Sequence, residues 1–211
     1  MGERITYEKE YWRGKKIAFL GDSITELNGF QAHLQKLLEL DTIYSYGRCG
    51  TTISGHNASF TVRAKDMKKD ADLIFIFGGT NDFHENAPLG AYKEAASEET
   101  FYGAMRLLCD ILKEEYNNSS IVFITPLQRV LPPKEGTDIK NKFGLELTDY
   151  VEAIKKVCAE YEFSILDLYS TSDITVETAE KYLYDGIHPN AEGFDVLANE
   201  IAAYLCHDED L

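Results

Sequence analysis

The sequence predicts an α/β fold, a three-layer α/β/α sandwich of the flavodoxin-like type with a five-stranded parallel sheet at its centre. Short apolar runs alternate along the chain with longer segments whose apolar residues recur at the helical period. Strands that alternate with helices imply crossover connections, and these connections favour parallel pairing. The run over residues 73–77 is apolar at every position, as expected when helices cover both faces of a sheet.

The first half of the chain supplies three of the predicted strands. Residues 16–21 form an apolar run that ends in glycine, and they are predicted as the first strand. Apolar residues at helical spacing predict a helix over residues 27–40. The second strand is expected over residues 42–46 and the third over residues 73–77.

The second half repeats the alternation. Residues 98–116 place Phe101, Met105 and Leu108 on one stripe, which predicts a helix. The fourth strand is expected over residues 120–125, before Pro126. The remaining predicted elements are a helix over 147–161, a strand over 163–168 and a helix over 191–205.

Composition limits the classes of partner. Lys and Arg number 21 and Asp and Glu 36, so the net charge is −15. This balance argues against nucleic-acid and anionic-lipid partners, which need clustered cations. Apolar runs reach only about five residues against the twenty of a membrane span, and the N-terminus lacks the apolar region of a signal peptide. We therefore expect one domain over residues 1–211, in the cytoplasm, with no nucleic-acid or membrane partner.

Four cysteines are spread along the chain and form no C-x-x-C pair. Metal and redox motifs need closer spacing, so we expect reduced thiols and no metal site. Cys49 alone lies next to Gly50, in the polar segment that follows the second predicted strand.

Polar residues gather where the predicted strands end. In a doubly wound sheet, ligands bind outside the carboxyl ends of the strands. Ser23 follows the first strand, Gly50 the second and Asn81 the third, while Asp185 and His188 precede the last helix. The fold therefore predicts one site that these segments share.

Three of these residue types fit nucleophilic catalysis. A serine is a weak nucleophile until a base takes its proton. Asp185 and His188 are close enough in sequence for one turn to bring the carboxylate to the imidazole, whose other nitrogen can then accept the Ser23 proton. We predict Ser23, Asp185 and His188 as the catalytic residues.

The other residues fit an oxyanion hole. The backbone N–H groups of Ser23 and Gly50 and the side-chain amide of Asn81 supply three donors for a tetrahedral oxyanion. Gly47 is the alternative to Gly50. Asp82 is expected to brace its loop through backbone hydrogen bonds, and Asp22 likewise.

The four segments together resemble the conserved blocks of the SGNH hydrolases, also called the GDSL esterase/lipase family. The family's serine, glycine, asparagine and histidine match Ser23, Gly50, Asn81 and His188. Gly21-Asp22-Ser23-Ile24 differs from G-D-S-L only in its last residue, and Asp185-x-x-His188 matches the family's D-x-x-H. The resemblance covers about residues 16–205 and implies ester hydrolysis through an acyl-serine intermediate without a metal or other cofactor.

The sequence is thus interpreted as a serine esterase for small-molecule esters, with short-chain or acetyl esters preferred, those of carbohydrates among them. One alternative is a thioesterase or acyltransferase of the same family. The other is an α/β module that binds a small ligand without turnover. Two long segments, residues 85–96 and 127–145, are expected to wall the site, and His84 is a candidate substrate contact.

Overall fold

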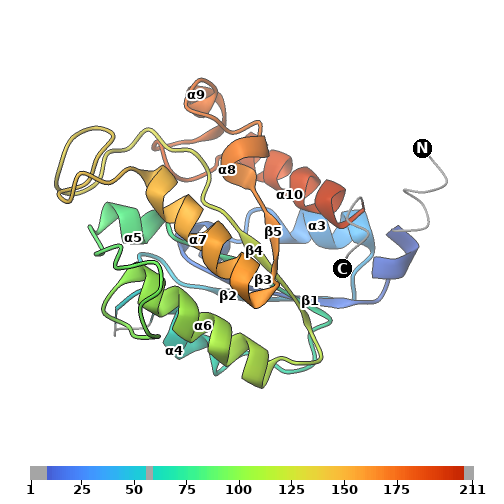
Figure 1. Cartoon of the computed structure of the whole chain (residues 1–211). Coiled ribbons are helices and arrows are strands. Elements are labelled where there is room, and N and C mark those ends of the chain that lie inside the picture. The colour runs from blue at the N-terminus through green and yellow to red at the C-terminus, as the bar shows by residue number, and fades with distance from the viewer. Residues whose placement is uncertain (1–8, 56–58, 207–211) are drawn as a thin grey trace.

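A five-stranded parallel sheet in the order β2-β1-β3-β4-β5 forms the centre of the structure, a computed structural model that describes residues 9–55 and 59–206 (Figure 1). Every neighbouring pair of strands runs parallel. The predicted α/β/α sandwich is therefore confirmed. The strands are β1 (Lys16–Gly21), β2 (Thr42–Gly47), β3 (Leu73–Phe77), β4 (Ser120–Ile124) and β5 (Ser164–Leu166).

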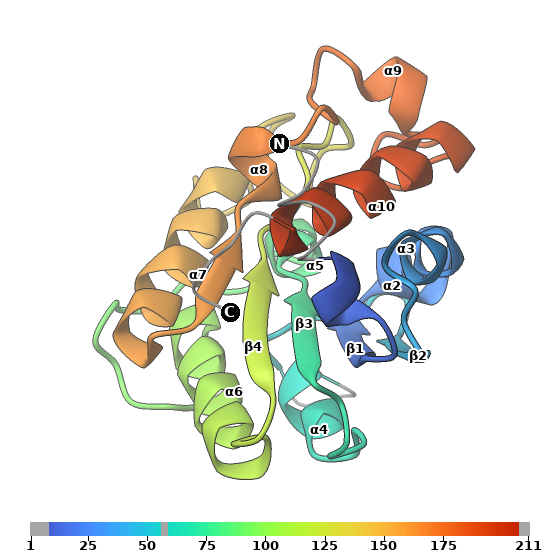
Figure 2. The same ribbon diagram turned by 90° about the vertical axis from the view of Figure 1, so that its right-hand side faces the viewer.

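Alternate side chains of the strands feed two apolar cores, one on each face of the sheet. Figure 2 shows the helices that cover the two faces. Leu20 and Ile76 belong to one core, and Phe19 and Phe75, whose rings stack at 4.9 Å, belong to the other. The first core is covered by α4 (Phe60–Ala64), α6 (Phe101–Glu115) and α7 (Leu147–Tyr161), and the second by α3 (Gln31–Leu38) and α10 (Ala191–Leu205).

Most predicted elements are confirmed, with shifted ends where local contacts decide. The helices over 147–161 and 191–205 match the prediction. The helix expected over 98–116 begins at Phe101, because the Thr100 hydroxyl accepts the Gly103 N–H and caps it. The helix expected over 27–40 is limited to α3, because Asn28 before it and Glu39 after it both adopt a left-handed φ of 55°.

Short helices were not predicted. They are α2 (Ser23–Glu26), α4, α5 (Thr80–His84), α8 (Leu168–Thr171) and α9 (Ala179–Tyr182). Two of them, α2 and α5, directly follow strands β1 and β3 and lie at the carboxyl ends of the sheet. They therefore point their first residues at the edge where the predicted site residues lie.

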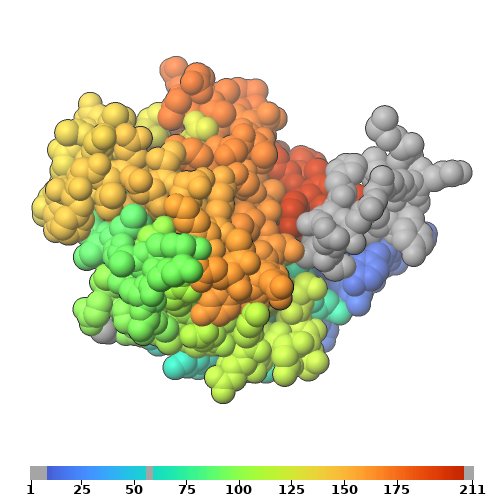
Figure 3. Space-filling view, viewed as in Figure 1, coloured from blue at the N-terminus to red at the C-terminus, as the bar shows by residue number. Residues whose placement is uncertain are grey.

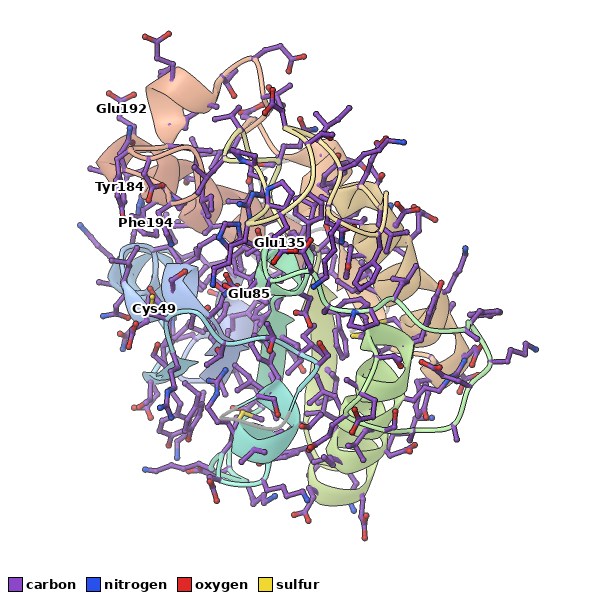
Figure 4. All side chains as sticks on the ribbon, turned by 90° about the vertical axis from the view of Figure 1, so that its left-hand side faces the viewer. Cys49, Glu85, Glu135, Tyr184, Glu192 and Phe194 are labelled. Carbon is purple, nitrogen blue, oxygen red and sulfur yellow. The ribbon has the colours of Figure 1, made fainter. Side chains whose placement is uncertain are left out.

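The segment after β4 extends outward at this end of the sheet, above α5, at the left of Figures 1 and 3. Figure 4 looks onto the same end, with Cys49, Glu85, Glu135 and Tyr184 on the face turned to the viewer. No helix in the described part of the chain is long and apolar enough to cross a membrane.

Candidate active site

Ser23 is the first residue of α2, directly after β1. The Asp22 carboxylate caps the helix by accepting the Ile24 N–H at 3.1 Å, which confirms its expected bracing role. Ser23 is only 6% exposed, and its Oγ lies 2.8 Å from His188 Nε2. Its own N–H, at the start of the helix, has no acceptor among the described residues.

His188 and Asp185 form the turn that the sequence predicts. The His188 Nδ1 atom lies 2.6 Å from Asp185 Oδ2, while Asp185 Oδ1 accepts the backbone N–H groups of Ile187 and His188 at 3.0 and 2.8 Å. Burial favours a raised pKa for Asp185, but the hydrogen bonds from His188 and Ile187 outweigh it and hold the pKa below its ordinary value. The ionised carboxylate therefore fixes the proton on Nδ1 and leaves Nε2 to face Ser23.

Neighbouring backbone holds this turn from two sides. The Tyr184 N–H donates to the His188 carbonyl at 3.0 Å, which closes the turn. The Gly186 carbonyl accepts the Val130 N–H at 2.9 Å. The segment over 127–145 thus contacts the histidine-bearing turn, in agreement with its expected place beside the site.

Gly50 presents an exposed backbone N–H in the loop after β2. It adopts a positive φ of 71°, and within the described chain its N–H has no acceptor. Gly47, the alternative donor, is packed against α2, where an added Cβ would lie 2.1 Å from the backbone nitrogen of Glu26. The geometry therefore favours Gly50 over Gly47.

Asn81 lies in the first turn of α5 and contacts the same loop. Its side-chain amide donates to the Thr51 carbonyl at 2.9 Å, which uses one of its two N–H groups. The structure thus brings Asn81 and the Gly50 loop together, as the sequence predicts.

Asp82 holds the Gly50 loop from beneath. Its carboxylate is fully buried and accepts the N–H groups of Ile53 and Ser54, both at 2.9 Å, and the Ser54 hydroxyl at 2.7 Å. Burial raises the pKa of Asp82, and these hydrogen bonds oppose the rise. Asp82 therefore braces a loop through backbone hydrogen bonds, as expected, but that loop is the one after β2 and not its own segment, which forms α5.

Arg63, on α4, ties three parts of this edge together, and sequence reasoning missed it. Its guanidinium donates to the Tyr46 carbonyl at 2.5 Å, the Gly21 carbonyl at 3.0 Å and Thr51 Oγ1 at 2.8 Å. Burial lowers its pKa to about 10, so the group stays charged at neutral pH. It joins the ends of β1 and β2 to the Gly50 loop.

Arg129 clamps α5 in a similar way. Its guanidinium donates to Thr80 Oγ1 at 3.0 Å at the start of the helix and faces His84 Nδ1 at 3.1 Å at its end. It also lies over the Phe83 ring, 5.6 Å from the centroid. The same Nδ1 atom lies 3.2 Å from the Pro132 carbonyl, so it can accept from Arg129 or, when it carries a proton, donate to Pro132. The expected substrate contact at His84 stays a prediction.

Asp22 is a second buried carboxyl beside the Ser23–His188 pair. Burial raises its pKa to about 7, although the Ile24 N–H and the His188 charge oppose the rise. It lines a cavity of about 10 Å³ together with Thr80, Arg129 and Ile187. That volume is at the lower limit for one water molecule.

Two larger cavities flank the site. One, of about 270 Å³, lies between the Gly50 loop and the segment after α5, with Ser54, Glu85 and Pro88 in its walls. The other, of about 170 Å³, is lined by Phe83, Arg129 and residues of the segment after β4. Both segments that were expected to wall the site therefore border cavities near it.

Candidate metal ligands and thiols are the remaining reactive groups of the described chain. No group of three or more His, Cys, Asp or Glu residues within it could hold a metal ion. Of the four cysteines, Cys49 is exposed, whereas Cys109, Cys158 and Cys206 are buried.

Known proteins resemble this chain in sequence. Residues 19–196 match the model of the GDSL-like Lipase/Acylhydrolase family. A GDSL esterase/lipase of Arabidopsis thaliana is 27% identical over 90% of this chain and 86% of its own length.

Solved structures resemble it as well. The crystal structure of a Lactobacillus plantarum protein superposes with a TM-score of 0.83 and 30% identity, over 92% of this chain and 97% of that one. The lipase/acylhydrolase of Enterococcus faecalis shares the fold, with a TM-score of 0.65 at 19% identity over 91% of this chain and 95% of its own. Because the family match spans most of the sequence and the fold agrees, the chain belongs to the GDSL-like lipase/acylhydrolase family of ester hydrolases.

Proposed function

We propose that the chain is a serine esterase for small substrates, with short-chain or acetyl esters preferred and carbohydrate acetates among them, and that it acts through an acyl-serine intermediate. The observation that supports this most directly is the chain of contacts from Ser23 Oγ to His188 Nε2 at 2.8 Å and from His188 Nδ1 to Asp185 at 2.6 Å. Such a chain lets the imidazole take the serine proton while the carboxylate stabilises the imidazolium that forms.

The reaction proceeds in two halves. Ser23 Oγ attacks the ester carbonyl as its proton passes to His188 Nε2, and the oxyanion accepts hydrogen bonds from the N–H groups of Ser23 and Gly50 and from Asn81. His188 then gives the proton to the departing alcohol as the C–O bond breaks. Water repeats the attack on the acyl-serine, His188 takes its proton, and the acid is released with Ser23 restored.

The preference for small acyl groups rests on the sequence, which contains no long apolar segment of the kind that forms the lid of a triglyceride lipase. The cavity of about 10 Å³ beside Asp22 and Ile187 is lined by neither Ser23 nor His188 and does not define the acyl pocket. The larger cavities lie farther along the edge of the sheet, beside Phe83 and Ser54.

Ser23→Ala tests the nucleophile. Wild type should hydrolyse p-nitrophenyl acetate and gain the mass of a fluorophosphonate, whereas Ser23→Ala should do neither. Ser119→Ala is the matched control, because the Ser119 hydroxyl donates to the Ala71 carbonyl at the opposite end of the sheet.

The same assay separates the alternatives. Full activity in Ser23→Ala would show the mechanism to be wrong. A wild-type preference for acyl-CoA, or transfer of the acetyl group to an added alcohol, would favour the thioesterase or acyltransferase. A wild type that cleaves no ester and takes no label would favour a binding module.

A further inference from the structure

Tyr184 places an exposed aromatic ring against the imidazole of His188. The two rings are stacked, with 18° between their planes and 5.6 Å between their centroids. The Tyr184 side chain is nevertheless 61% exposed. In Figure 4 it lies on the face formed by the carboxyl ends of the strands, on the segment that leads into α10.

Apart from its stacking on His188, the ring has no packing or hydrogen-bonding role among the described residues. Its hydroxyl has no hydrogen-bond partner there, and the ring belongs to neither apolar core. The turn is closed by the Tyr184 backbone, whose N–H donates to the His188 carbonyl at 3.0 Å. A change of the side chain therefore leaves the hydrogen bonds that shape the turn in place.

The chemistry puts the alcohol part of the substrate near this ring. His188 Nε2 protonates the departing alkoxide, so the alcohol must bind within hydrogen-bond reach of that nitrogen. The surroundings are partly apolar, because Val130 packs at Gly186 on the same turn and is 51% exposed. Slight burial and the charge of Asp185 raise the pKa of Tyr184, so the ring carries a neutral phenol at pH 7.

We propose that the exposed face of Tyr184 is the platform for the alcohol part of the substrate, and that the enzyme selects esters whose alcohol carries a ring with an apolar face, such as a sugar or an aromatic ring. This inference rests on the proposed esterase function and extends it from the acyl group to the leaving group. An aromatic side chain stacks on either kind of ring and gains little from a small linear alcohol.

The test compares three acetate esters that differ only in their alcohol: ethyl acetate, benzyl acetate and an acetylated methyl glucoside. Released acetate is measured in each case, so that one readout serves all three. Tyr184→Ala should lower kcat/KM about 3- to 10-fold for an ester that carries a ring, mostly through KM. The change for ethyl acetate should stay within about 2-fold, and Tyr184→Phe should retain the wild-type preference.

Tyr11→Ala is the matched control, because Tyr11 is 56% exposed and precedes the amino end of β1, away from the site. It should leave all three esters unchanged. Comparison of benzyl acetate with the acetylated glucoside shows which ring the platform prefers. A loss of kcat/KM in Tyr184→Ala on either of these two esters alone supports the inference.

Three results would overturn the inference. An equal loss on ethyl acetate would mean that Tyr184 acts through His188 and not on the alcohol. No loss on either ring ester, or a loss in Tyr184→Phe as large as in Tyr184→Ala, would exclude the stacking platform. A wild type that cleaves none of the three esters would instead remove the proposed function, and the inference with it.

Discussion

Replacing Asp82 by asparagine tests whether the buried carboxylate positions the Gly50 loop for catalysis. The carboxylate accepts three hydrogen bonds, two from the backbone of Ile53 and Ser54 at 2.9 Å and one from the Ser54 hydroxyl at 2.7 Å. Asparagine keeps the size but offers one acceptor oxygen, so its NH2 group must face a backbone N–H. The lost charge-assisted bond is worth about 1.5–3 kcal/mol, and the buried donor left unpaired costs about 1–3 kcal/mol.

Asp82→Asn also removes an unfavourable contribution to stability, which offsets part of this loss. Burial raises the pKa of Asp82, which means that the folded chain pays to hold the charge, and the neutral amide removes that cost. We therefore expect the free energy of unfolding to fall by about 2 kcal/mol, measured by urea denaturation. The larger effect should be on turnover, because the same loop carries Gly50 and the Thr51 carbonyl that holds Asn81. Displacing one oxyanion donor should lower kcat about 100-fold with little change in KM, measured with p-nitrophenyl acetate.

Asp72→Asn is the matched control. Asp72 accepts the Lys16 N–H at 2.8 Å and pairs with Lys15 at 3.0 Å at the opposite end of the sheet. This variant should lose stability and keep kcat. The reasoning is refuted if Asp82→Asn retains kcat within about 3-fold of wild type, or if Asp72→Asn lowers kcat as much.

Two further predictions concern the groups around Ser23. Because burial raises the pKa of Asp22 to about 7, the folded chain binds a proton that the unfolded chain has already released, and Asp22 should make stability fall as pH rises from about 4 to 7. Asp22→Asn, which keeps an acceptor for the Ile24 N–H, should flatten this part of the curve of urea midpoints against pH, and an unchanged slope would contradict the assignment. Arg129→Met frees both ends of α5 and should lower kcat about 10-fold by displacing Asn81. In an Asn81→Ala background, Arg129→Met should lower kcat by less than a further factor of about 2. If the two losses in kcat instead multiply in the double variant, Arg129 acts elsewhere and not through Asn81.

The parts of the fold that could be read from the sequence are those with a repeated signal. A signal of this kind is present in the strand over 73–77 and in the helices over 147–161 and 191–205, where the spacing of apolar residues placed each element correctly. The five-residue α5 and the four-residue α2 are too short for apolar residues to recur at the helical spacing. Their existence depends on contacts with distant segments, such as the clamp of Arg129 on Thr80.

The candidate site follows the same division. Ser23, Gly50, Asn81 and His188 could be selected because each follows or precedes a predicted element at one edge of a parallel sheet. Arg129 also follows a predicted strand, so the same rule could have identified it. Arg63 carries no such signal, since its partners Gly21, Tyr46 and Thr51 are neighbours only in the folded chain.

The Ser23–His188 contact joins residues 165 positions apart, and this separation has a consequence for biosynthesis. In the proposed mechanism Ser23 is the nucleophile and His188 its base, so the base is translated 165 residues after the nucleophile. Under that mechanism the nascent chain carries an inert serine until the turn before α10 docks beside α2. Recovery of ester hydrolysis would then report the docking of this turn, and in a refolding experiment activity should return no earlier than the slowest spectroscopic phase.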